Sequence, residues 1–211
     1  KFQPEQAVTK IEEIVVQVGK TGTLTPVANL TPVLLAGTTV SRATLHNFDE
    51  IRRKDIREGD YVMLQKAGEI IPQVVTVLKE KRKGTETPFT EPPTCPECKE
   101  KVVRDDTEVY LRCHNPFCQA QVKRRIQYFA GRDAMDIEGL GPALVEQLVD
   151  KGFVKDYADI YYLRYEDLIT LERMGEKSSQ NLIHAIEAGK HRDLDRLICA
   201  LGILNVGSHT A

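Results

Sequence analysis

The chain has 211 residues, of which 41% are hydrophobic and 28% charged, so it is long enough for one or two domains with cores of their own plus a small module. Its formal net charge of −2 excludes binding to nucleic acid through overall positive charge and leaves only local patches or backbone groups for such contacts. No signal peptide or membrane-spanning apolar run is visible, which predicts a cytoplasmic protein without a membrane partner.

Residues 1–80 have the composition of a β-domain. Segments rich in Val, Ile, Leu and Thr, such as IEEIVVQVG and DYVMLQKAG, are separated by turn residues that include Gly22, Pro26 and Gly37. One polar, helix-like insert, LHNFDEIRRKDIREGD, interrupts them. Several short strands with one helix predict a small barrel, for which the oligonucleotide-binding (OB) barrel is the natural candidate. A β-domain of another use is the alternative, because fold alone does not determine function.

Two close pairs of cysteines follow a charged, proline-rich segment that we predict to be a linker, residues 81–94. The pairs are Cys95-x2-Cys98 and Cys113-x4-Cys118, and the residues between them have the pattern of a short hairpin around Asp105-Asp106. Such pairs can place four thiolates around one Zn²⁺, so residues 95–119 are predicted to be a zinc module. Because four sulfur ligands leave no position for water, this zinc is structural.

Other uses of these cysteines are weaker. Two disulfides would imply secretion, and a redox pair would leave the second cysteine pair without a role. His114 could replace a thiolate, although Cys118 makes the two pairs match. Cys199 lies in an apolar helical pattern and is interpreted as a small buried side chain.

From about Gln119 onward, apolar residues recur at helical spacing, which predicts an all-α domain over residues 120–211 and gives a multidomain α+β protein. This part contains an internal repeat, in which IEGLG, LERMG and ILNVG end at Gly141, Gly175 and Gly207. The glycines are 34 and 32 residues apart, close to the length of one helical pair.

Each repeated glycine is expected to lie between two helices, with Pro142 as an early residue of the second helix. A glycine turn lets the backbone approach a ligand, and the next helix start offers free N–H groups to a phosphate. The predicted DNA-binding residues of the repeats are Gly139, Gly141, Gly175, Lys177 and Gly207. The alternative is ordinary helical-hairpin packing, in which glycine only allows a close crossing.

A basic run follows the zinc module and consists of Lys123, Arg124 and Arg125. It could be a solvated helix face. Its place beside a zinc module and before phosphate-binding turns favours contact with a nucleic-acid backbone. Such contacts position a protein without reading the sequence, so binding by shape is expected.

Runs along nearly the whole chain resemble the bacterial NAD-dependent DNA ligases. They are KFQPEQAVTK, VGKTGTLTPVANLTPVLLAGTTVSRATLHN, EGDYVMLQKAGEIIPQVV, the four-cysteine module with CQAQ, GRDAMDIEGLG, LERMGEKSSQNL and ALGILNVGSHTA. The resemblance implies the end of an adenylation domain, then the OB-fold domain within residues 1–80, the four-cysteine zinc finger and a truncated helix-hairpin-helix domain over residues 120–211.

In this family a lysine attacks NAD⁺ to form lysyl-AMP, the AMP passes to the 5′-phosphate of a nick, and the 3′-hydroxyl displaces it with Mg²⁺ assisting. The resemblance therefore implies sealing of nicks in double-stranded DNA during replication and repair, by a monomer. No K-x-D-G, the motif of the nucleophilic lysine, occurs in these residues. We expect no catalytic residue in the chain and no activity from it alone.

Two further sites rest on the resemblance alone. Lys1 matches the motif lysine that contacts the phosphate of bound nucleotide, and Gln3 replaces the usual proline after Lys-Phe. Lys20 matches a position, commonly arginine, that contacts DNA phosphate near the nick, and lysine keeps the charge there without the bidentate fork.

Two other functions are compatible with the same residues. One is a stand-alone, non-catalytic zinc and helix-hairpin-helix module that binds DNA in repair. The other is a protein-interaction scaffold held together by zinc, which salt-dependent DNA binding would exclude.

Overall fold

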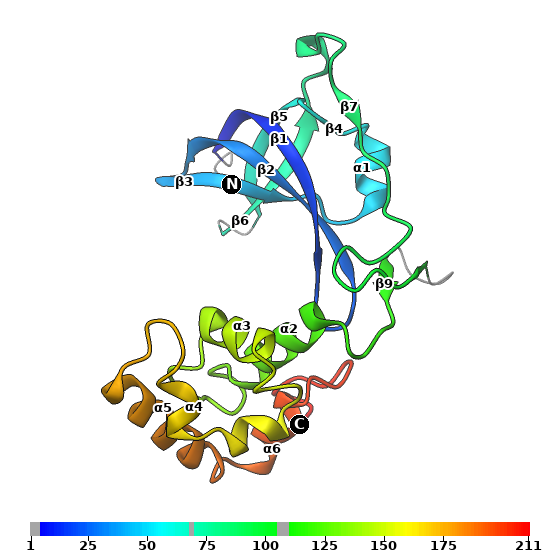
Figure 1. The fold of residues 1–211 in the computed structure, drawn as a ribbon. Helices are drawn as coiled ribbons and strands as arrows, with labels where there is room; N and C mark the ends of the chain where they lie inside the picture. The colour runs from blue at the N-terminus through cyan, green and yellow to red at the C-terminus, as the bar shows by residue number, and fades with distance from the viewer. Residues whose placement is uncertain (1–4, 68–69, 105–109) are drawn as a thin grey trace. The chain divides into compact units, whose positions relative to one another are not determined.

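The computed structural model describes residues 5–67, 70–104 and 110–211, and the chain divides into two compact units, residues 1–115 and 116–211. The described part of the first unit contains strands and two short helices (Figure 1). Their bounds are β1 (Gln6–Val18), β2 (Leu24–Leu35), β3 (Thr38–Thr44), α1 (Phe48–Lys54), β4 (Arg57–Glu58), β5 (Tyr61–Ala67), β6 (Ile71–Val77), the 3-10 helix η1 (Lys79–Lys81), β7 (Thr87–Pro88), β8 (Val102–Arg104) and β9 (Leu111–Cys113).

Five of these strands form a closed barrel, as predicted, and their order around it is β1-β2-β3-β6-β5. Neighbouring strands are antiparallel except β3 and β6, which meet through one parallel pair, Thr44 and Gln73. Along the first half of β2, alternate residues from Leu24 to Leu30 are buried, as expected of a strand with one face on a core. Pro26 lies inside β2 opposite Val16, so its prediction as a turn residue is wrong.

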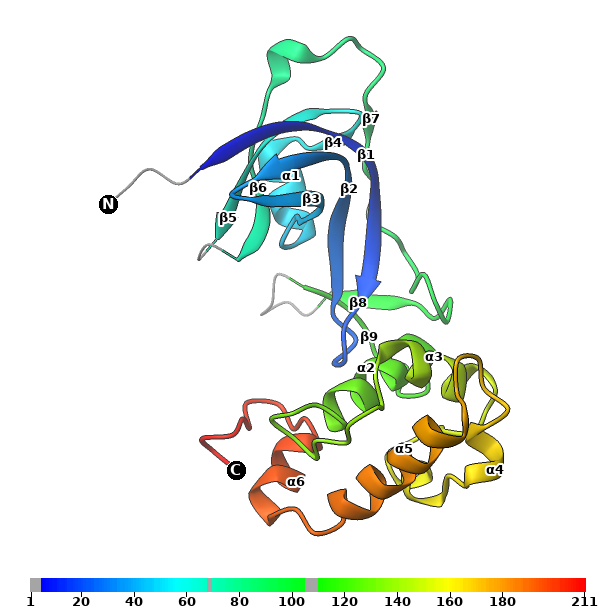
Figure 2. The same cartoon turned by 90° about the vertical axis from the view of Figure 1, so that its left-hand side faces the viewer.

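The hairpin of β1 and β2 is longer than the barrel wall. Residues 6–10 of β1 pair with β5, whereas Glu13–Val18 pair, among the described residues, with β2 alone. The two strands therefore extend beyond the barrel as an arm, which Figure 2 shows in blue. The turn at residues 19–23 is the tip of this arm.

The polar insert forms α1, as predicted. The Asn47 side chain accepts a hydrogen bond from the Glu50 N–H at 2.8 Å, and Asp55 ends the helix in the left-handed conformation. Phe48 and Ile51 are buried in the barrel core, so a helix with many charges still contributes apolar area to the unit.

The segment predicted as a linker lies against the barrel in the structure. Arg82 donates from Nε to Asp60 Oδ1 and from Nη1 to Asp55 Oδ2, both at 2.7 Å. β7 pairs with β4, and the rings of Phe89 and Phe48 stack at 6.1 Å between centroids. These contacts form because the segment carries side chains that complement the barrel surface.

The second unit, residues 116–211, contains helices and no strand, and all of its residues are described (Figure 1). The predicted helical segments correspond to α2, α3, α5 and α6, and Pro142 begins α3 as expected. The bounds are α2 (Gln119–Phe129), α3 (Pro142–Asp150), the 3-10 helix η2 (Ala158–Tyr162), α4 (Tyr165–Leu168), α5 (Glu176–Gly189) and α6 (Leu194–Ala200).

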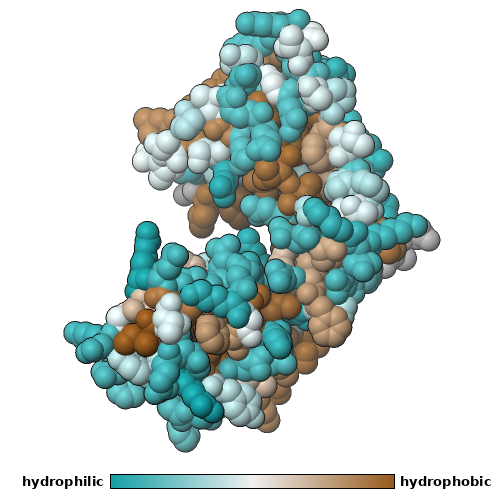
Figure 3. Space-filling view, viewed as in Figure 1, coloured by the Kyte–Doolittle hydropathy of each residue, from teal (hydrophilic) through white to brown (hydrophobic). Residues whose placement is uncertain are grey.

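A single apolar core holds these helices together. Phe129 stacks on Tyr157 with 4.9 Å between ring centroids and meets Tyr161 edge-on. Ile126, Leu148 and many other aliphatic side chains fill the rest of this core. The face shown in Figure 3 has hydrophilic and hydrophobic areas next to one another. Within the described parts of the chain, no helix has the length and apolarity needed to cross a membrane.

Candidate metal centre and nucleic-acid interface

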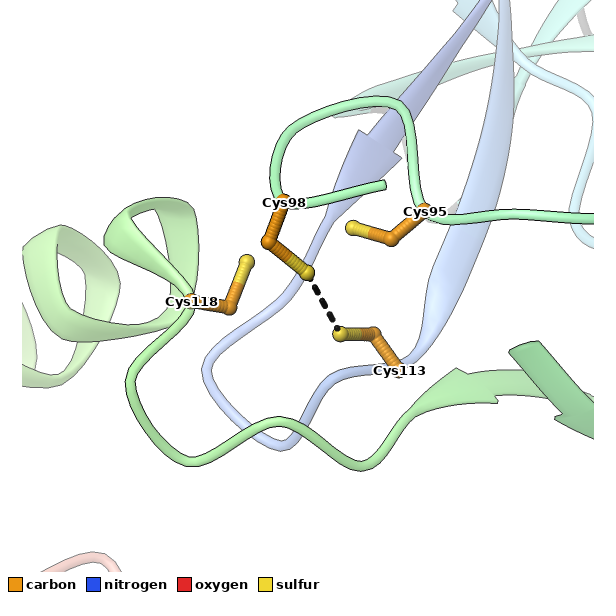
Figure 4. A group of neighbouring side chains, drawn as sticks. All are labelled: Cys95, Cys98, Cys113 and Cys118. Atoms are coloured by element: carbon orange, nitrogen blue, oxygen red, sulfur yellow. Dashed lines mark hydrogen bonds between the residues drawn. The ribbon is translucent and has the colours of Figure 1, made fainter. Parts of the chain in front are cut away.

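The four paired cysteines converge on one point (Figure 4). The Sγ atoms of Cys95, Cys98, Cys113 and Cys118 all lie within 4.8 Å of one another. All five cysteines of the chain are described, and none forms a disulfide. His114 is exposed and does not belong to the group, so the ligand set expected from matched pairs is the one that the structure brings together.

Local backbone structure positions each sulfur. The Cys95 N–H donates to Glu100 O at 2.8 Å, and Lys99 donates back to Cys95 O from a left-handed conformation, which closes a tight turn around the first pair. Cys113 ends β9, which pairs with β8 through Val102. Cys118 immediately precedes α2, and its carbonyl accepts the Val122 N–H at 2.9 Å. The hairpin turn expected at Asp105-Asp106 lies outside the described residues.

The chemistry of the cluster fits zinc. A tetrahedral site with Zn–S bonds of about 2.3 Å requires sulfurs roughly 3.8 Å apart, and the Sγ atoms of Cys98 and Cys113 are 3.5 Å apart. Burial raises the pKa of the Cys113 thiol to about 12. At Cys98 burial also acts to raise the pKa, but hydrogen bonds, led by the Glu100 backbone, lower it to about 7. A metal would displace thiol protons here, so its binding would release protons.

The three repeated glycines share one local geometry. In each copy the residue just before the glycine donates its N–H to the carbonyl three residues earlier. The N···O distances are 3.2 Å for Leu140, 3.2 Å for Met174 and 3.0 Å for Val206. The carbonyl of the following glycine then accepts the N–H four residues on, at 3.0 Å in every copy. The sequence repeat is therefore also a repeat of backbone structure.

Neither packing nor backbone conformation requires glycine at these three positions. A methyl group on Gly141, Gly175 or Gly207 would meet no atom within 4 Å. Gly141 and Gly175 are the N-caps of α3 and α5 and have negative φ. A close helix crossing does not explain them, and the space outside each turn is open to an approaching ligand.

The third copy differs from the first two. The aliphatic residues that begin the first two copies, Ile137 and Leu171, are buried, whereas Ile203 is 51% exposed. After Gly207 the described chain makes a single helical turn, which ends at Ala211. The third glycine therefore has the geometry of the others without the same apolar support.

The structure separates the three cations of the basic run. Lys123 is 21% exposed and its Nζ lies 2.7 Å from Asp150 Oδ1 on α3. Arg125 donates to the backbone carbonyls of Pro116 and Gln121. Arg124 is exposed and makes a long hydrogen bond to a neighbouring side chain. Of the three, Arg124 is the side chain best placed to meet a phosphate.

The remaining predicted residues are Lys177, Lys20 and Lys1. Lys177 is exposed in the first turn of α5, two residues after Gly175. Lys20 is half-buried in the tip of the β1–β2 arm. Lys1, the predicted nucleotide contact, lies outside the described residues. The structure therefore brings the cysteines together, whereas the predicted cations belong to both units, Lys20 to the first and Arg124 and Lys177 to the second.

Sequence reasoning missed two features of the site. The third position of each repeated turn has positive φ, and it is occupied by Gly139, Arg173 and Asn205. Only the glycine and the asparagine signal this conformation in the sequence. The second feature is Arg112, which contacts the β1–β2 tip and has no local signal.

Comparisons with known proteins identify two domains in the first 120 residues of the chain. Residues 8–86 match the NAD-dependent DNA ligase OB-fold domain, and residues 94–120 match the NAD-dependent DNA ligase C4 zinc finger domain. The chain is 60% identical over 211 residues to a DNA ligase of Pelotomaculum thermopropionicum, covering 100% of the chain and 31% of the relative. It is 57% identical to a DNA ligase of Halothermothrix orenii over 98% of the chain and 31% of the relative. The chain thus spans about three tenths of the length of the curated relatives it matches.

Proposed function

The chain belongs to the NAD-dependent DNA ligase family, whose OB-fold and C4 zinc finger domains it contains, and we propose that it is the DNA-binding part of a ligase. The observation that carries the proposal is the threefold turn geometry, in which each glycine faces open space ahead of a helical turn. Such turns offer backbone N–H groups to phosphates without needing net positive charge. This reconciles DNA binding with the formal net charge of −2.

Zinc has a structural role in this proposal. The ion would be bound by the thiolates of Cys95, Cys98, Cys113 and Cys118. With four sulfur ligands, zinc would cross-link the chain and would have no position for a reactive water molecule. The buried sulfurs of Cys95, Cys113 and Cys118 support this role, because a reactive centre needs access from solvent. We place the predicted boundaries of the module at residues 95–119.

The helical unit is proposed to be a helix-hairpin-helix domain that binds the backbone of nicked double-stranded DNA. The exposed Lys177 lies beside the second turn, and Arg124 is exposed on α2. Lys20 would add a phosphate contact from the tip of the β1–β2 arm. Because phosphate contacts read no base sequence, binding is expected at any nick.

Nick sealing is proposed for the longer protein and not for this chain alone. The adenylation chemistry needs a nucleophilic lysine in a K-x-D-G motif, which the 211 residues lack. Incubating the chain with NAD⁺ and Mg²⁺ and measuring its mass should therefore show no gain. A mass increase equal to one AMP would overturn this part of the proposal.

DNA binding can be tested on the chain itself by titrating a labelled nicked duplex at several salt concentrations. The logarithm of the association constant should fall linearly with the logarithm of the salt concentration. Lys177→Ala should weaken binding several-fold, because it removes a cation beside a phosphate-binding turn. The matched control is Lys190→Ala, at the other end of the same helix, where the side chain pairs with Glu187 at 2.6 Å.

Two outcomes would contradict the proposal. No binding to nicked duplex at low salt would leave the protein-interaction scaffold as the better hypothesis. Equal weakening by the two lysine variants would show that binding responds to total charge and does not depend on the repeated turns.

A further inference from the structure

The tip of the β1–β2 arm is attached to the strand that carries a metal ligand. The Cys113 N–H donates to Gly22 O at 2.9 Å, so a cysteine of the cluster holds the tip through its own backbone. Next to this bond, Thr23 and Arg112 form an isolated antiparallel bridge. Figure 4 shows the blue loop of the arm beside the four cysteines.

A side chain reinforces the same contact. Arg112 Nη1 lies 2.9 Å from Thr23 Oγ1 and 3.4 Å from Thr21 Oγ1, and the two threonine hydroxyls are 3.2 Å apart. One guanidinium therefore connects both threonines of the tip to β9.

The tip also has an ordered backbone of its own. The Gly19 N–H donates to Thr23 O at 2.9 Å, and the Gly22 N–H donates to Gly19 O at 3.0 Å. Gly22 has a φ of +79°, a backbone conformation that residues other than glycine rarely adopt. Lys20 lies between these bonded residues, so whatever fixes the tip also fixes the backbone that carries Lys20.

The zinc module contacts the barrel unit at a second place, through Arg104. Arg104 of β8 donates to Asp49 Oδ1 of α1 at 3.1 Å and to Glu91 Oε2 at 2.9 Å. The strand pair β8–β9 is thus attached at one strand to α1 and at the other to the arm. Because the zinc module is fixed at both strands, an ordered module restricts the motion of the tip that it contacts. An arm without such contacts would bend more freely.

We propose that the metal centre anchors the β1–β2 arm through Cys113 and Arg112, so that metal occupancy determines where Lys20 lies. Arg112 is then a positioning residue that acts through Thr21 and Thr23. That Lys20 meets a DNA phosphate rests on the proposed function, but the anchoring of the tip does not.

Hydrogen exchange tests the anchoring directly. The amides of Gly19 and Gly22 should exchange at least tenfold faster after chelation of the metal, while amides of β5 keep their rates. Arg112→Ala should have the same effect at Gly22 with the metal still bound at one equivalent. The matched control is Lys101→Ala, which removes an exposed cation from the same module. Unchanged exchange at residues 19–23 in both chelated protein and Arg112→Ala would overturn the inference.

A double-mutant cycle on nicked-duplex affinity tests the positioning. Arg112→Ala should weaken binding about threefold to tenfold in the native background and have no effect in Lys20→Ala, since it acts through Lys20. Arg112→Lys should restore part of the affinity, because an ammonium can still donate to Thr23. Equal losses in both backgrounds would refute positioning of Lys20. If Lys20→Ala alone leaves affinity unchanged, the DNA role of Lys20 fails, and the exchange rates still decide the anchoring.

Discussion

Each of the two units has an apolar core of its own, but their polar side chains make different kinds of contact. In the first unit, polar side chains far apart in sequence meet at defined points, such as Arg82 with Asp60 and Arg104 with Asp49. In the second, an apolar core runs through the helices, and the ion pairs join side chains that reach solvent. Among the described residues, Asp60 is the charged side chain that is completely buried.

This difference has an energetic consequence. The stability that an apolar core provides falls in proportion to the apolar area or volume that a substitution removes from it. A single substitution at the surface removes little of either, so its effect is small. A buried charge or a metal ligand depends on particular partners, and the loss of one partner leaves an unsatisfied group behind. The first unit should therefore respond sharply to single polar substitutions, and the second should tolerate them.

Loss of the metal should produce the largest effect. Cys113→Ser should abolish stoichiometric zinc binding and unfold the described residues of the zinc module, 95–104 and 110–119, because zinc binding contributes roughly 10 kcal/mol in isolated zinc-finger peptides. Metal content and thermal unfolding measure the result. The control is Cys199→Ala, a buried cysteine outside the cluster whose Sγ lies 3.6 Å from Tyr128 Oη, and this variant should keep its zinc.

A Cys113→Ser protein with a full equivalent of zinc would exclude the four-sulfur site. The same result would remove the strongest of the proposed constraints on the three cysteines that the first unit contributes, Cys95, Cys98 and Cys113.

Substitution of the buried carboxylate should have the next largest effect. Asp60→Ala leaves Arg82 beside a buried gap and removes the acceptor of the Arg57 N–H, so about 3–5 kcal/mol of stability should be lost. Urea unfolding measures this loss. The comparison in the second unit is Glu187→Ala, which breaks an exposed pair with Lys190 and should cost less than about 1 kcal/mol. Similar losses in the two variants would contradict the contrast between the units.

The same contrast explains which features the sequence could predict. The barrel, the cysteine cluster and the repeated turns follow from alternation, ligand spacing and periodicity, all of which are local patterns. The pairing of Arg82 with Asp60 could not be predicted, because Gly-Asp is typical of an exposed turn and KRKG is typical of a solvated linker. Arg112 and Thr23 are 89 residues apart, and no pattern in either segment indicates their contact.

Acid should weaken the first unit at α1. A side-chain hydrogen bond from Arg53, with a further contribution from Lys54, lowers the pKa of Glu50 to about 2 from its ordinary value of 4.5, and burial opposes this shift. A carboxyl whose pKa is lowered by folding stabilises the folded state above its unfolded pKa. That contribution is lost as the pH falls from about 4.5 through about 2.

The contribution of Glu50 should be about 1 kcal/mol, since solvent screens this partly exposed group. Urea unfolding between pH 7 and pH 2 should show a smaller pH dependence for Glu50→Gln than for the native chain. Hydrogen bonds from Arg52 and Arg82 likewise lower the pKa values of Asp49 and Asp55, so part of the acid sensitivity should remain. Identical pH profiles for the two proteins would show that the α1 ion pairs do not stabilise the unit.

The smallest effects should separate two neighbouring cations on α2. Lys123→Ala breaks the contacts with Asp150 at 2.7 Å and Glu146 at 3.9 Å, so it should cost about 0.5–1 kcal/mol of stability and change DNA affinity little. Arg124→Ala removes an exposed side chain, so its effect on stability should stay within about 0.5 kcal/mol. If Arg124 meets a phosphate, its loss should reduce the slope of log affinity against log salt by about 1.

Urea unfolding and salt titrations on both variants measure these quantities side by side. The two residues are adjacent cations in the sequence, and only their surroundings distinguish them, since α3 carries carboxylates on one side of α2. The reverse assignment, in which Lys123→Ala changes the salt slope and Arg124→Ala does not, would mean that DNA displaces the ion pair with Asp150. In that case the exposed ion pairs of the second unit would be exchangeable contacts of the binding surface, and its apolar core alone would account for its stability.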